Sequence, residues 1–137
     1  DLDPARIERT RTLMERALPA ARVYGHERLV DTLVLPDPDD RHVLAAAIHC
    51  GSEVIVSFNL PDFPGVALSP YRVEAIHPDD LLSEFVASDA VKFVGAVREL
   101  RAALLNPAYT PDELIDALRR TGLPKSASVL TAMKELF

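Results

Sequence analysis

Apolar residues in the middle of the chain form a helix-sized run followed by a strand-sized run. Residues 43–50 are mostly apolar and rich in alanine, which predicts a helix, and Gly51 breaks it. The next run, Val54–Val56, is continuously apolar, which is typical of a strand that is covered on both faces. Because such a strand follows the helix directly, we expect an α/β fold with a parallel sheet flanked by helices.

The other expected elements are mainly helices. They are helices at 4–18, 26–33, 81–86, 89–105, 111–121 and 124–136, strands at 20–24 and 71–76, and a loop at 66–69. Asp79 and Asp80 are expected to cap the helix that follows them, and Thr110 and Glu113 have the spacing of a capping box. We therefore expect an α/β domain at residues 1–87 and an all-helical extension at residues 88–137.

Polar residues precede the alanine-rich helix and follow the strand. A helix from Asp40 to Cys50 is roughly 16 Å long, and a strand of five residues ending at Ser57 is also about 16 Å long. Because a strand that follows a helix in a parallel sheet returns to the edge where the helix began, Asp40 should lie near Asn59 and Asp62. Such a cluster of oxygen ligands suits a hard cation such as Mg²⁺.

The same residues also have an ordinary structural interpretation. Asp39 and Asp40 are favourable at the start of a helix, where backbone N–H groups lack partners. The segment from Asn59 to Asp62 has the composition of a simple turn. Spacing alone therefore leaves a metal site and a pair of caps as alternatives.

Two segments of the chain closely resemble conserved blocks of the PIN-domain nucleases, and in particular of VapC-type toxins. The first is DPDDRHVLAAAI, residues 37–48, and the second is VIVSFNLPDFP, residues 54–64; YRVEAIHPDDLL, residues 71–82, matches more loosely. The resemblance implies a partial PIN-like sheet, RNA as the substrate and a small antitoxin protein as the partner. It implies that Asp40, Asn59 and Asp62 are catalytic and hold Mg²⁺, or Mn²⁺ in its place, with Asp37 as a further acidic residue around the metal.

The chain departs from the family pattern at its beginning. PIN nucleases carry an Asp on the first strand and an acidic residue on a helix soon after it, and nothing before Leu35 matches either position. We therefore expect the N-terminal half of the fold to be cut away, present as another chain, or lost, and this chain alone to be inactive. The buried strand should then pair with that N-terminal fragment or with a second copy in a homodimer.

Composition narrows the classes of function only modestly. The net charge of −6 argues against a simple nucleic-acid-binding surface, although an acidic site can recruit cations that contact phosphate. The single Cys50 excludes an internal disulfide and fits a buried structural thiol in a cytoplasmic protein, and no apolar run is long enough to span a membrane. Three basic clusters are either RNA contacts or solvated helix faces: Arg6/Arg9/Arg11, Arg98/Arg101 and Arg119/Arg120/Lys125.

Three functions remain as alternatives. The first is a metal-dependent endoribonuclease of the VapC type, as the resemblance implies. The second is a non-catalytic PIN-like scaffold or dimerisation module that lacks a complete acidic cluster. The third is a small α/β domain that binds a ligand at the same edge of the sheet.

Overall fold

A computed structural model describes residues 3–137 of the chain, and these residues divide into two compact units. The N-terminal unit consists of residues 3–55 and 62–74, and the C-terminal unit consists of residues 56–61 and 75–137. The division falls within the sheet region, whereas the sequence predicts a domain boundary between residues 87 and 88. That predicted boundary stays a prediction.

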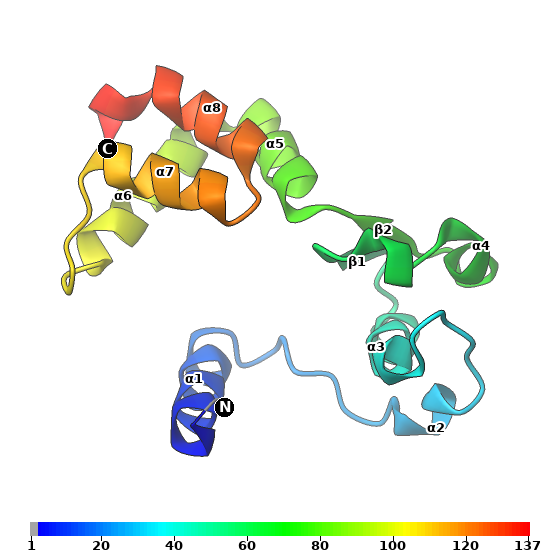
Figure 1. The fold of residues 1–137 in the computed structure, drawn as a ribbon. Helices are drawn as coiled ribbons and strands as arrows, with labels where there is room; N and C mark the ends of the chain where they lie inside the picture. The colour runs from blue at the N-terminus through cyan, green and yellow to red at the C-terminus, as the bar shows by residue number, and fades with distance from the viewer. Residues whose placement is uncertain (1–2) are drawn as a thin grey trace. The chain divides into compact units, whose positions relative to one another are not determined.

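The N-terminal unit is mainly helical. Its helices are α1 (Pro4–Ala17), α2 (Glu27–Val30), α3 (Arg41–Cys50) and α4 (Gly65–Leu68), with short 3-10 helices at Pro38–Asp40 and Ser69–Tyr71 (Figure 1). The apolar face of α3 is buried through Leu44, Ala45 and Ala47. The helix ends at Gly51, which has a φ of 69° and so adopts the left-handed conformation that glycine tolerates best.

A small sheet of two strands, β1 (Val54–Val56) and β2 (Glu74–Ile76), follows α3 (Figure 1). The strands are parallel, because the paired positions advance together: Glu74 N–H donates to Glu53 O and Ser57 N–H donates to Ile76 O. The expected α/β class with a small parallel sheet and a helical C-terminus is confirmed. Within residues 3–137, β1 pairs with β2 on one side only, and Val56 is 45% exposed.

Four predictions of local structure in the N-terminal part were wrong. Residues 20–24 form no strand, and residues 66–69 belong largely to α4 rather than to a loop. The 3-10 turn Ser69–Tyr71 and the left-handed Arg72 delay the start of β2, which is therefore shorter than expected. Cys50 is exposed rather than buried, because it lies in the last turn of α3, away from its buried face.

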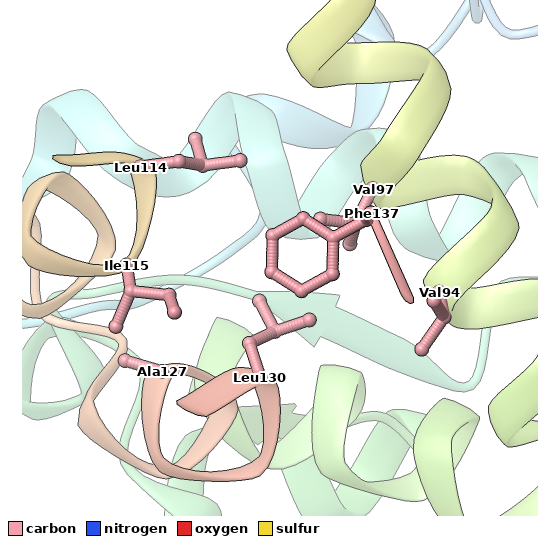
Figure 2. Packing of buried hydrophobic residues seen from close by; sticks show 7 residues of the cluster. All are labelled: Val94, Val97, Leu114, Ile115, Ala127, Leu130 and Phe137. Atoms are coloured by element: carbon pink, nitrogen blue, oxygen red, sulfur yellow. The ribbon is translucent and has the colours of Figure 1, made fainter. Parts of the chain in front are cut away.

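The C-terminal unit contains four helices and one final turn. These are α5 (Pro78–Ser88), α6 (Ala90–Ala103), α7 (Pro111–Arg120), α8 (Pro124–Ala132) and a 3-10 turn at Lys134–Leu136. The apolar faces of α6, α7 and α8 meet with the last residue of the chain in one cluster, shown in Figure 2: Val94, Val97, Leu114, Ile115, Ala127, Leu130 and Phe137. Leu130 is fully buried there, so the cluster is a true core for the helices.

Two helix caps in this unit show where local sequence rules hold and where they fail. The capping box is confirmed: Glu113 N–H donates to Thr110 Oγ1, and Thr110 N–H donates to the Glu113 carboxylate. The expectation that Asp79 caps α5 was wrong, because the ring of His77 takes that place and accepts the Asp79 N–H at 3.2 Å. The Asp79 carboxylate is buried and instead caps α8, where it accepts bonds from Lys125 N and Ser126 N.

Candidate functional site

The carboxylate of Asp40 stands at the start of α3 without capping it. Asp40 ends the 3-10 turn Pro38–Asp40, is half-buried, and makes no side-chain hydrogen bond to the first turn of α3. Asp37, by contrast, accepts a bond from Asp39 N–H at 2.8 Å and caps the 3-10 turn. The capping residue is therefore Asp37, and the expectation that Asp40 caps the helix was wrong.

Asp40 and Asp62 form a carboxyl pair within the N-terminal unit. Asp62 lies at the end of the 3-10 helix Leu60–Asp62, and its negative charge acts on the carboxyl of Asp40. Burial, followed by the negative charges of Asp37 and Asp62, raises the pKa of the Asp40 carboxyl above its ordinary value. Like charges held this close disfavour one another, and a bound cation would relieve that repulsion.

Short-range bonds fix the turn that carries Asp40. The side chain of Arg41 donates from Nε to Pro38 O at 2.8 Å, and His42 Nδ1 lies 2.6 Å from Asp39 O. His42 has the opposite effect to Asp37 and Asp62: its electrostatic interaction with Asp40 lowers the pKa of that carboxyl. The ring of His42 is thereby engaged with the backbone of the turn.

Asn59 belongs to the C-terminal unit and is described with it. Its backbone N–H donates to Ser57 Oγ at 3.0 Å, and the N–H of Ser57 donates to Ile76 O of β2 at 3.1 Å. The loop that follows β1 is thereby fixed at its base, and the side chain of Asn59 is exposed. The structure thus brings together Asp37, Asp40 and Asp62 among the predicted ligands, and Asn59 lies on a loop that belongs to the C-terminal unit.

The side chains of Asp37, Asp40 and Asp62 offer carboxylate oxygens, the type of ligand that a hard cation such as Mg²⁺ prefers. Carboxylate oxygens are the preferred protein ligands of Mg²⁺, which commonly takes one or two of them and keeps several waters. Within residues 3–137, no three His, Cys, Asp or Glu side chains converge into a complete metal-binding group. The Asp40–Asp62 pair therefore suits a weakly held, largely hydrated ion.

Each of the three predicted basic clusters has at least one member that is bonded within the protein. Arg119 pairs with Asp116 and donates to Thr131, and Lys125 pairs with Asp80. Arg101 donates to the backbone carbonyl of Tyr109, and Arg11 pairs with Glu8. These contacts favour the interpretation of the clusters as stabilised helix faces.

One residue that the sequence analysis passed over is Phe58, which lies between Ser57 and Asn59. Its ring meets that of His77 edge-to-face, with the centroids 5.1 Å apart. An aromatic residue next to a candidate ligand is a weak signal, because most such residues belong to a core. Phe58 does not, since it is 60% exposed.

Comparisons with known proteins give two matches. Residues 78–132 match the family described as the VapC50 C-terminal domain. A protein of Mycobacterium tuberculosis (strain ATCC 25618 / H37Rv) named "Putative ribonuclease VapC50" is 46% identical over 81 residues, which are 58% of this chain and 47% of the relative. The chain thus spans about half the length of this curated relative. No solved structure matches. In the part of the chain that is described, no helix is both long enough and apolar enough to cross a membrane.

Proposed function

Because this chain belongs to the VapC-type PIN nuclease family, we propose that it forms part of a metal-dependent endoribonuclease. The observation that carries the proposal is the Asp40–Asp62 pair, in which neighbouring negative charge and burial raise the pKa of Asp40 without any capping role for its side chain. The scaffold alternative gives no reason to keep two carboxyls in so unfavourable an arrangement.

The residues have separate roles in this proposal. Asp40 would bind the metal directly, Asn59 and Asp62 would hold the metal or its waters, and Asp37 would add negative charge around them. When bound, Mg²⁺, or Mn²⁺ in its place, would supply an activated water and charge stabilisation at the scissile phosphate. The protein residues keep the site in place: Asp62 orients Asp40, and the Ser57–Asn59 bond sets the loop that carries Asn59.

The proposal extends to partners and to the open edge of the sheet. The substrate is RNA, and the protein partner is an antitoxin that covers the acidic site until the enzyme is released. The side of β1 that β2 leaves unpaired accepts a further strand, either from another segment of the gene product or from a second copy in a homodimer. Such pairing would also cover Val56, which is 45% exposed. A cytoplasmic location fits this activity.

We expect the 137-residue chain on its own to have no ribonuclease activity. The two carboxyls of the described pair can hold Mg²⁺ only weakly, whereas catalysis needs an ion of fixed geometry. The assay is cleavage of a mixed RNA substrate, with Mg²⁺ or with EDTA, by this chain and by the product of the full open reading frame that contains it.

We expect cleavage by the full product with Mg²⁺, no cleavage with EDTA, and none by the 137-residue chain in either buffer. Cleavage by the full product that survives EDTA would contradict metal dependence. Absence of cleavage by any product of the gene would favour the scaffold function instead. Cleavage by the 137-residue chain that Asp40→Ala abolishes would show that the described residues are sufficient.

A further inference from the structure

Backbone hydrogen bonds of Ser57 and Asn59 hold the loop that carries Asn59, and the ring of Phe58, between these two residues, makes further contacts. Ser57 joins the loop to β2 and accepts the Asn59 N–H, as described above. Between these two residues, Phe58 turns its side chain toward the α7–α8 turn and the start of α5. The ring therefore holds the middle of a three-residue segment whose ends are already hydrogen-bonded.

The contact of Phe58 with the α7–α8 turn depends on a glycine. A Cβ built on Gly122 would lie 3.3 Å from Phe58 Cε1, a close contact that would require the ring to shift by a few tenths of an ångström, and 3.5 Å from Phe58 Cδ1, an ordinary contact. Gly122 also has a φ of 88°, a conformation that other residues adopt only with strain. Two features thus coincide at Gly122: the turn needs a left-handed residue, and an added side chain would displace the Phe58 ring.

The turn that Phe58 touches is itself tightly held. Gly122 N–H donates to Arg119 O at 3.2 Å and Leu123 N–H donates to Leu118 O at 3.0 Å, which closes the end of α7. Immediately afterwards, the buried Asp79 accepts bonds from Lys125 N at 2.7 Å and from Ser126 N at 2.8 Å. These bonds fix the start of α8 against α5.

Phe58 also contacts the residue that caps α5. His77 precedes α5 and caps it by accepting the Asp79 N–H, and its ring is the second partner of Phe58, with an interplanar angle of 88°. The ring of Phe58, although 60% exposed, therefore lies beside both the cap of α5 and the turn between α7 and α8. All these residues belong to the C-terminal unit, so the arrangement is internal to it.

We propose that Phe58 is a positioning residue that couples the α7–α8 turn to Asn59. Residues 78–132, the segment that matches the VapC50 C-terminal domain, would then set the place of an active-site side chain in addition to forming a separate core. An effect of Phe58 on catalysis rests on the proposed ribonuclease function. The physical coupling of Phe58 to Asn59 is testable without any activity.

The test is a double-mutant cycle followed by NMR of the Asn59 side-chain amide in the 137-residue chain. The variants are Phe58→Ala, Gly122→Ala and the double variant, with Gly51→Ala as the matched control. Gly51 has a φ of 69° but an added Cβ would meet nothing within 4 Å, so this variant carries backbone strain without a ring contact. Phe58→Tyr, which keeps the ring, is the conservative rescue.

We expect Phe58→Ala and Gly122→Ala to shift the Asn59 amide signals, and Gly51→Ala and Phe58→Tyr to leave them in place. In the double variant the added methyl meets no ring, so the combined shift should be smaller than the sum of the two single shifts. Thermal unfolding of each variant separates this local effect from loss of the fold. An unchanged Asn59 signal in folded Phe58→Ala, or fully additive shifts, would overturn the coupling.

Activity provides the second readout and keeps the two proposals distinguishable. In the full gene product, Phe58→Ala should lower kcat for RNA cleavage by about tenfold to a hundredfold, because small displacements of a positioned group are costly, while KM changes little. A wild-type product that fails to cleave RNA overturns the ribonuclease proposal, and the NMR cycle still decides the coupling. An active product whose kcat is unaffected by Phe58→Ala overturns the positioning role.

Discussion

Replacing Asp79 with alanine should lower the free energy of unfolding by about 3 kcal/mol, because it removes a buried acceptor that holds the start of α8. The Asp79 side chain is 2% exposed and accepts three bonds, from Lys125 N, from Ser126 N and from Ser126 Oγ at 2.6 Å. Alanine would leave these donors without their acceptor, and the two donors of Ser126 are buried away from water. Chemical denaturation monitored by circular dichroism measures the loss.

Asp80 offers a matched control for the loss of Asp79. It is the next residue on α5, and its carboxylate pairs with Lys125 at the surface, with 47% of the side chain exposed. Because exposed ion pairs contribute little, Asp80→Ala should leave the unfolding transition nearly unchanged. A loss in Asp79→Ala no greater than that in Asp80→Ala would contradict the role given to the buried carboxylate.

The stability that Asp79 supplies should also depend on pH. Burial raises the pKa of its carboxyl, but the bonds from Ser126 and Lys125 outweigh burial and bring the pKa below its ordinary value of 3.8. A carboxyl with a depressed pKa binds its proton less tightly in the folded state, so its contribution is complete above pH 3.8 and is lost as the pH falls through the folded pKa. Asp79→Asn should be less stable at neutral pH and lose less stability on acidification than the wild type.

Replacing Asp40 with asparagine should abolish Mg²⁺-dependent RNA cleavage by the full gene product, with a loss of at least about a hundredfold. Asparagine keeps the size of the side chain but removes the negative charge that binds the ion. Cleavage rates at saturating Mg²⁺ measure the effect. A variant that keeps more than a tenth of the wild-type rate would contradict the ligand role of Asp40.

The same substitution should leave the fold as stable as before or make it more stable. Because the pKa of Asp40 is raised, its ionised form is less favourable in the folded chain than in the unfolded chain at neutral pH. Asparagine removes that unfavourable charge. Asp37→Ala is the opposite control, since it removes the acceptor for Asp39 N–H and should lower the melting temperature. A clear fall in the melting temperature of Asp40→Asn would indicate a structural role for Asp40.

The sequence predicts elements well where the signals are local. The box formed by Thr110 and Glu113 is confirmed, and α3 ends at Gly51 as expected, because each depends only on residues within one or two turns. The start of α5 has equally good local signals, yet its Asp79 binds the backbone of Lys125, 46 residues further on. Local rules cannot tell an acidic residue that caps its own helix from one that caps another.

The candidate site shows the same division between local and distant information. The resemblance to PIN nucleases pointed to Asp40 and Asp62, and the structure adds that the charges of Asp37 and Asp62 raise the pKa of Asp40 and that Asp37 is the capping residue. Phe58 was missed because its partners, His77 and Gly122, are distant in the sequence. Burial of Cys50 was predicted from its apolar neighbours, but the register of α3 leaves this last turn exposed.

Binding of Mn²⁺ followed by NMR tests the central claim, a divalent-cation site at Asp40 and Asp62, most directly. A paramagnetic ion broadens the signals of nearby nuclei even when it binds weakly and in substoichiometric amounts. The account predicts that signals of Asp40, Asp62 and Asn59 in the 137-residue chain broaden first, that excess Mg²⁺ restores them, and that Asp40→Asn abolishes the effect. Broadening centred on Asp112 and Asp116, the exposed acidic residues of α7, would contradict a site at Asp40 and Asp62. Broadening that is the same in Asp40→Asn as in the wild type would also contradict it.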